Sequence, residues 1–252
     1  MSSGRWAAIA AACVLAAADG LCEAPSLDPA AMLRAADAPR DAFQEGVIGL
    51  KVVVNERGKQ PQASAMELYV SGGDKSLAVF REGKQKGRKI LTVGDKTWLI
   101  VPGASRPVPV SKSQRLMGAA SIGDIARLRF ADEYVATLSP DVEAIAGPSG
   151  EERCHRLDLS AKRKGAAYPT AVLWVGANDG LPRRLRLSLA SGKAAKDVAF
   201  TRYDDKHRIA VMGIHDLVAA GGANVTELVF ERYEKRALDA SLFDPVGARN
   251  LP

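Results

Sequence analysis

The sequence predicts a mainly β protein with short helices, in which about eleven strands form one antiparallel sheet. The first observation is a period-two alternation of apolar and polar residues, which starts after Gly46 and returns through most of the chain. The second is that short turns separate these runs, whereas parallel strands would need long crossovers. The third is that no linker or internal repeat divides the chain. A single domain is therefore expected over residues 25–252.

Residues 1–24 have the three-part layout of a cleaved signal peptide. Met1–Arg5 carries one positive side chain, Trp6–Ala18 is apolar, and Asp19–Ala24 is polar with small residues. The apolar run is too short to span a bilayer. We therefore expect export across the inner membrane to the periplasm, with a mature protein that starts between Asp19 and Pro25.

A short helix is expected in Ser26–Phe43, where apolar residues recur at near-helical spacing and Pro39 ends the run. The strands are expected after it. The turn sequence Asn178-Asp179-Gly180 predicts a hairpin because Gly readily adopts the positive φ of a tight turn. The expected strands cover residues 48–54, 66–70, 77–80, 89–93, 97–101, 154–159, 168–175, 185–189, 198–203, 209–214 and 225–233.

The stretch Ser111–Ala146 interrupts the alternation. Ile122, Ile125 and Leu128 have helical spacing, and a looser helical spacing continues at four later apolar positions. We expect one or two helices and loops here, inserted between strands. The later positions are Tyr134, Leu138, Val142 and Ile145.

Two of the expected strands are apolar on both faces. In Thr97–Val101, Trp98 and Ile100 share one face, and in Tyr168–Val175 Val172 and Trp174 do so. Both faces of such a sheet must be covered. Either helices cover the second face, or the inner face lines a cavity for an apolar ligand, in which case tryptophan fluorescence would report binding.

No catalytic or metal-binding motif is found in the chain. The sequence has no nucleophile elbow, phosphate-binding loop, dinucleotide fingerprint or zinc-protease motif. His155, His207 and His215 are scattered, and Cys154 and His155 would point to opposite faces of a strand. We expect a protein that is not an enzyme and has no cofactor and no metal.

The chain is basic, with a formal charge of +6 and a pI of about 9.3. Three cationic clusters lie at or beside predicted turns: Lys84–Lys89, Lys162–Lys164 and Arg183–Arg186. Their few aromatic neighbours do not indicate nucleic-acid binding. The clusters are either solvated surface or contacts for lipid headgroups or an acidic partner.

A Ser- and Gly-rich loop follows the strand at residues 97–101. It contains Arg106, Arg115, Leu116, Met117 and Asp124. Exposed Leu and Met in a polar loop are unusual for a simple connector and typical of a lid. We take Arg106, Arg115 and Asp124 as lid candidates.

Four segments resemble the LolA/LolB-like superfamily of outer-membrane lipoprotein-sorting proteins, and most closely its branch found beside RND-type exporters. They are the loop above with residues 111–126, Lys86–Leu91 with Asp95–Trp98, Leu173–Pro182, and Leu238–Pro245. The resemblance covers residues 46–245. It implies a half-open antiparallel β-barrel with a helical lid or plug.

The resemblance also implies a function. Members of the superfamily carry acylated molecules across the periplasm in an apolar groove, so lipid or lipoprotein acyl chains are the expected ligands. The expected partners are an inner-membrane transporter and an outer-membrane acceptor. The candidates for lining the groove are Trp98, Ile100, Leu116, Met117, Val172 and Trp174. The alternative is an envelope-stress sensor that binds an anti-sigma factor, because related folds occur in such proteins.

Overall fold

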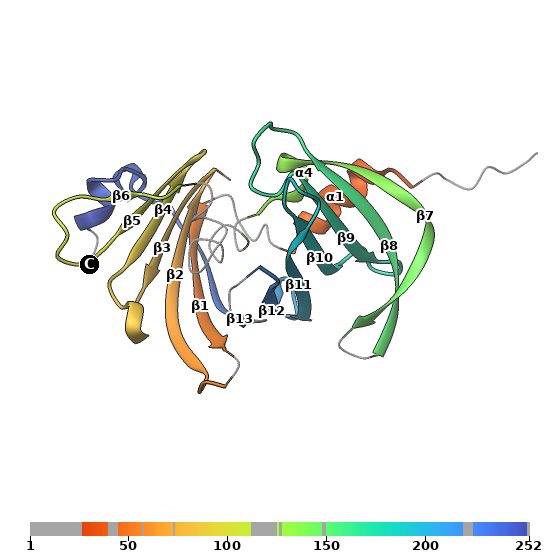
Figure 1. The fold of residues 1–252 in the computed structure, drawn as a ribbon, viewed down its shortest axis with the longest axis horizontal. Coiled ribbons are helices and arrows are strands. Elements are labelled where there is room, and N and C mark those ends of the chain that lie inside the picture. The colour runs from red at the N-terminus through yellow and green to blue at the C-terminus, as the bar shows by residue number, and fades with distance from the viewer. Residues whose placement is uncertain are drawn as a thin grey trace, which may run out of the picture.

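The computed structural model describes residues 27–39, 45–56, 58–72, 74–111, 125, 128–147, 150–218 and 224–250 (Figure 1). The signal-peptide prediction for residues 1–24 lies outside the described residues. So do the predicted lid and groove residues Arg115, Leu116, Met117 and Asp124. Within the described ranges, every helix is too short or too polar to cross a membrane.

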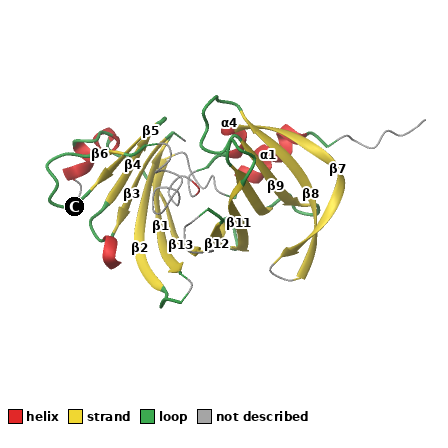
Figure 2. Ribbon diagram, viewed as in Figure 1, coloured by secondary structure: helices red, strands yellow, loops and turns green. Residues whose placement is uncertain are grey.

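The described residues form one antiparallel sheet of thirteen strands in the order β6-β5-β4-β3-β2-β1-β13-β12-β11-β10-β9-β8-β7. Strands dominate the molecule, and the sheet curves into a trough (Figure 2). Because β6 and β7 are the two edges and do not pair with each other, the barrel is half-open, as predicted. The strands are β1 Glu45–Asn55, β2 Gln62–Ser71, β3 Lys75–Phe80, β4 Lys89–Val93, β5 Lys96–Ile100, β6 Val108–Pro109, β7 Tyr134–Gly147, β8 Gly150–Ala161, β9 Thr170–Gly176, β10 Pro182–Ser188, β11 Ala194–Tyr203, β12 Ile209–Asp216 and β13 Asn224–Lys235.

The first and last strands of the chain meet in the middle of the sheet. β1 pairs with β2 on one side and with β13 on the other, so that Leu50 lies opposite both Met66 and Phe230. All three side chains face the same side of the sheet and pack in the same cluster. The two halves of the trough, β2–β6 and β7–β12, are therefore joined through β1 and β13.

The helical prediction for residues 134–145 was wrong, because this stretch is the edge strand β7. Its pairing with β8 shifts between Leu138 and Val142. Before the shift Tyr134 and Ala136 are the less exposed residues, and after it Glu143 and Ile145 are. Because of this shift, the large apolar residues of β7 are three or four residues apart, which is the spacing expected of a helix. Two strands, β7 and the two-residue β6, were not predicted. They account for the difference between the eleven predicted strands and the thirteen observed.

The predicted N-terminal helix is confirmed as α1 (Pro29–Asp37). The Asp28 carboxylate accepts hydrogen bonds from the Ala30 and Ala31 N–H groups, which satisfies two of the free donors at the helix start. At its other end the Pro39 carbonyl accepts from Ile209 N, 3.1 Å away, and ties the helix to β12. The other helices whose bounds lie within the described residues are α4 (Phe130–Glu133), η1 (Gly83–Gln85), η2 (Ala240–Phe243) and η3 (Gly247–Asn250).

The two faces of the sheet carry two separate apolar clusters. The concave cluster is the larger and runs from β1–β4 through β13 to β7, with α1 and α4 packed on it (Figure 1). The convex cluster lies on β1–β5 and is covered by η2 and η3. Helices therefore cover the second apolar face of β5, which was one of the two alternatives drawn from its sequence.

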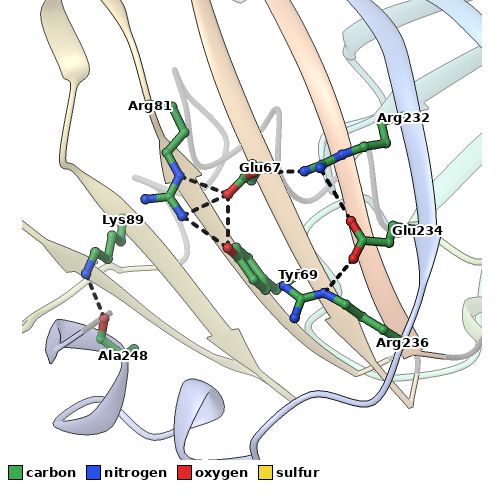
Figure 3. A network of polar contacts seen from close by, with 8 residues as sticks. All are labelled: Glu67, Tyr69, Arg81, Lys89, Arg232, Glu234, Arg236 and Ala248. Carbon is green, nitrogen blue, oxygen red and sulfur yellow. Dashed lines mark hydrogen bonds and ion pairs between the residues drawn. The ribbon is translucent and has the colours of Figure 1, made fainter. Parts of the chain in front are cut away.

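A buried lysine fixes the C-terminal cover to the convex face. Lys89 is 5% exposed, and its ammonium donates to the Ala248 and Arg249 carbonyls over 3.0 and 3.1 Å (Figure 3). Burial, together with nearby Arg81, lowers the pKa of Lys89. Beside it, the Glu67 carboxylate accepts from Arg81, Arg232 and Tyr69. These contacts bind β2, β3 and β13 together under the C-terminal segment.

We expect Lys89→Met to loosen this cover. The change leaves two carbonyls without their donor, so the free energy of unfolding should fall by about 1–3 kcal/mol. Urea unfolding measures the loss, and limited proteolysis should cut first within residues 238–250. Lys84→Met, an exposed change in the neighbouring turn, is the control. Equal stability of the two variants would show that the Lys89 contacts contribute nothing.

Candidate functional site

The concave face of the trough is the candidate site. Its surface consists of the inward-facing apolar residues of eleven strands, and most of these side chains are almost fully buried. The short helices α1 and α4 lie on this surface (Figure 1). Helix α1 contributes only Leu33 and Ala36 to the buried cluster, with Met32 at its margin. Because α1 and α4 pack on the concave face without being part of the sheet, we call the two helices the plug.

One carboxylate fastens the two helices to each other. Asp37, the last residue of α1, is 4% exposed. Its Oδ1 accepts from Phe130 N over 2.7 Å, and its Oδ2 accepts from Ala131 N over 2.8 Å. A carboxylate on the N-terminal N–H groups of α4 makes charge-assisted bonds. The two helices of the plug are therefore held to each other.

A pocket of about 90 Å³ opens where the plug meets the rim of the trough. We call it the mouth pocket. Its apolar wall includes Ile125, Leu128, Tyr168 and Leu187, and its rim contains charged residues of two turns. The Tyr134 hydroxyl closes one side by donating to the Tyr168 carbonyl over 3.0 Å, and burial raises the pKa of this tyrosine.

The rim is closed by an ion pair between two connections that lie far apart in the sequence. Arg163 in the β8–β9 connection donates to Asp95 in the β4–β5 turn, with 2.6 Å between Nη1 and Oδ1. In Figure 1 the β8–β9 connection leans across the trough toward β4 and β5. Both side chains are more than half exposed. An exposed pair of this kind contributes at most about 1 kcal/mol, so the rim is closed only weakly.

The predicted lining residues Trp98 and Ile100 belong to the convex cluster, not to the groove. Their neighbour Leu99 packs against the concave cluster instead. Alternation shows that the two faces of β5 are different, but it does not show which face is inside. The predicted lid residue Arg106 is exposed between β5 and β6 and is not among the residues that line the mouth pocket.

Val172 and Trp174 also lie outside the concave cluster, whereas Ala171, Leu173 and Val175 belong to it. Trp174 is 7% exposed, and its Nε1 donates to Glu143 over 2.7 Å. Two guanidinium groups, those of Arg184 and Arg186, lie 5.7 and 5.9 Å from its ring centroid. Cations over an indole ring are favourable, and they cover the ring on the convex side. Neither Trp98 nor Trp174 is therefore placed to report a ligand in the groove by its fluorescence.

The acid stability of this convex face should depend on Asp197. Burial disfavours its ionised form, but hydrogen bonds from Arg184 and Arg186 outweigh burial, and the pKa of Asp197 is lowered. A lowered carboxyl pKa contributes stability above the unfolded value, near 3.8, which is lost as the pH falls through the folded value. We expect Arg184→Gln/Arg186→Gln to be less stable than wild type at pH 7.

The stabilities of wild type and Arg184→Gln/Arg186→Gln should become similar in acid. Urea unfolding at pH 7 and at about pH 2 measures the difference at each value, and it should shrink at the lower one. Arg202→Gln/Lys206→Gln, which removes two charges at exposed positions of β11 and the turn after it, corrects for net charge. A difference that stays constant between the two pH values would mean that the arginines act through Trp174 packing alone.

Sequence reasoning missed the residues that form the mouth pocket. The sequence assigns Ile125 and Leu128 only to a helical insertion, and it places Leu187 only within the strand expected at residues 185–189. The signal that was present is the basic cluster Lys162–Lys164, for which a headgroup contact was one interpretation. Asp37 gave no sequence signal, because its partners are ninety residues away.

An open antiparallel half-barrel with a helical plug on its concave face defines the LolA-like fold, and the comparisons agree. A LolA superfamily protein from Nitrosomonas europaea superposes with a TM-score of 0.73 at 23% identity, covering 86% of this chain and 98% of that one. An outer membrane lipoprotein-sorting protein domain from Vibrio parahaemolyticus gives 0.66 at 16% identity, and a DUF1329 family protein from Desulfovibrio piger gives 0.65 at 20%, with the same coverage. The predicted resemblance is thus confirmed for the fold.

A family model described as "Uncharacterized protein" matches residues 72–246, which is more than half of the chain. The chain belongs to this family. No curated protein matches the sequence.

Proposed function

We propose that the protein is a periplasmic carrier that binds acyl chains of a lipid or lipoprotein on the concave face, and that it acts by binding rather than by catalysis. The single observation that carries the proposal is the concave face itself: a continuous apolar surface on an unclosed sheet, covered by two short helices. A structural core needs no open side. The charged groups of the described mouth pocket lie on its rim, which suits an amphiphile better than a reaction centre.

The proposed cycle requires the plug to move. The mouth pocket of about 90 Å³ is smaller than the roughly 150 Å³ cavity that holds one benzene. An acyl chain therefore enters by displacing α1 and α4 from the concave face. Each buried methylene contributes about 0.8 kcal/mol, so a chain of about twelve carbons offsets the loss of the few contacts of α1. Binding stays reversible, as a carrier requires.

The proposal extends to direction and partners, and the fold shared with a lipoprotein-sorting protein domain supports this extension. The carrier would receive its cargo at the inner membrane, together with an RND-type transporter, and release it to an outer-membrane acceptor. An opened rim is the natural site of transfer, because the Asp95–Arg163 ion pair is exposed and is weakened by salt or by a charged surface.

The first experiment is to purify the protein from periplasm, extract it with organic solvent and identify bound lipid by mass spectrometry. Delipidated protein is then titrated with laurate below its micelle concentration in a calorimeter. We expect a bound lipid and a saturable heat. An empty protein that also gives no heat with laurate would overturn the carrier proposal, and capture of an anti-sigma factor would then favour the sensor.

A filled-pocket variant links binding to the site. Ala167 lines the mouth pocket and is half-buried, so Ala167→Trp places an indole where the chain should enter. Laurate affinity should fall by about tenfold, equivalent to 1.4 kcal/mol. Ala237→Trp, on the exposed segment after β13, is the matched control. Equal affinity of the two variants would place the chain elsewhere.

A further inference from the structure

The β8–β9 connection carries three consecutive cations, Lys162, Arg163 and Lys164, and each is held differently. The Lys162 backbone N–H donates to the Glu133 carbonyl over 2.9 Å, and its ammonium donates to the Ala131 carbonyl over 2.6 Å. These two contacts fix the base of the connection to α4. The loop therefore presents its next two residues at a defined place on the rim.

Arg163 and Lys164 both line the mouth pocket. Arg163 spans the opening to reach Asp95. Lys164 is exposed and has no acidic partner in the part of the chain that the structure describes. Two carboxylates line the same pocket: Glu133, which is half-buried, and exposed Asp95, whose ion-pair partner is Arg163. Neither carboxylate forms an ion pair with Lys164 within the described residues.

The wall beneath these cations is apolar. Leu128, Tyr168 and Leu187 are all less than one tenth exposed, and they continue into the concave cluster. Arg163 and Lys164 above this apolar wall match the two ends of an amphiphile that has an anionic group. An uncharged headgroup would leave Lys164 without an ionic partner.

We propose that Arg163 and Lys164 bind the anionic headgroup, a carboxylate or phosphate, of a ligand whose acyl chain enters the mouth pocket. This rests on the proposed carrier function and names its ligand class. On binding, the headgroup replaces Asp95 as the partner of Arg163. The exchange is easy because the Asp95–Arg163 pair is exposed and weak. The ligand thereby opens the rim that it passes through.

The test compares headgroups on one chain length. Laurate and dodecyl phosphate are the anionic probes and distinguish a carboxylate from a phosphate, and monolaurin is the neutral probe. Each is titrated into delipidated protein by calorimetry below its micelle concentration. Wild type should bind the anionic probes more tightly than monolaurin, and the preference should weaken as salt rises.

Two variants should move the affinity in opposite directions. Arg163→Gln/Lys164→Gln should weaken the anionic probes by about tenfold and leave monolaurin unchanged. Asp95→Asn should strengthen the anionic probes by about threefold, because it removes the competing carboxylate. Arg202→Gln/Lys206→Gln removes the same charge at exposed positions of β11 and the turn after it, and should change neither.

The outcomes separate this inference from the carrier function. If the double variant loses monolaurin and laurate equally, the loop has a structural role and headgroup recognition is wrong. If it binds all probes like wild type, headgroup recognition is also wrong while the carrier function stands. If wild type binds none of the probes, the carrier function itself fails.

Discussion

Asp216→Asn should destabilise the protein by about 3–5 kcal/mol, the largest effect expected for a single polar change in the described chain. Asp216 is the ion-pair partner of Lys196, whose side chain is only 1% exposed. Register places Lys196 opposite Leu187, so this ammonium lies on the concave side of the sheet. Without its carboxylate, a buried positive charge remains with no compensation. Urea or guanidinium unfolding at pH 7 measures the loss.

A second pair of variants identifies the cause. Lys196→Met removes the buried charge and keeps most of the side-chain volume, so it should destabilise less than Asp216→Asn. The double variant should recover part of the loss, because both charges are then absent. Glu56→Gln breaks an exposed pair with Lys59 and should change stability by less than about 1 kcal/mol. Additive losses in the double variant would rule out an unpaired charge as the cause.

Asp37→Ala should lower stability by about 3 kcal/mol, because it leaves the buried N–H groups of Phe130 and Ala131 without their carboxylate. The same change should release α4 from α1 and make the groove easier to enter. Laurate should therefore bind faster to the variant than to wild type in stopped-flow measurements. Unfolding midpoints measure the stability.

The control for Asp37 is Asp37→Asn, which keeps one side-chain oxygen as an acceptor and should lose less stability than the alanine variant. Asp28→Ala, at the exposed start of the same helix, removes an N-cap and should destabilise by about 1 kcal/mol without changing laurate kinetics. Slower laurate binding in Asp37→Ala would contradict the role of the helices as a plug.

The alternation of residues is sufficient to predict most of this sheet, and the exceptions have identifiable causes. Leu50, Val52 and Leu187 occur where a period of two places them, and these strands are predicted correctly. β7 was not predicted because its pairing shifts after Leu138. The less exposed residues are therefore at even positions before the shift and at odd positions after it. Strand patterns assume continuous pairing, so a bulge hides a strand whose residues otherwise alternate.

The candidate site was less predictable, because it depends on which face of the sheet curves inward. Trp98 and Trp174 satisfy the pattern of a buried strand, yet one packs in the cluster beneath η2 and η3 and the other lies beneath arginines. The mouth pocket joins the β4–β5 turn, the β8–β9 connection and the start of β7, which lie far apart in the sequence. Only the fold brings Asp95 to Arg163.

The open sheet has a consequence for self-association. An unclosed sheet presents two edges whose free N–H and C=O groups are able to pair with another chain and seed aggregation. Here one edge, β6, has two residues and ends at Pro109, which has no N–H to donate. The other edge, β7, is interrupted at its register shift, where Pro140 lies. Both edges are thus poor templates for strand addition, so the groove stays open without recruiting further copies of the molecule into a fibre.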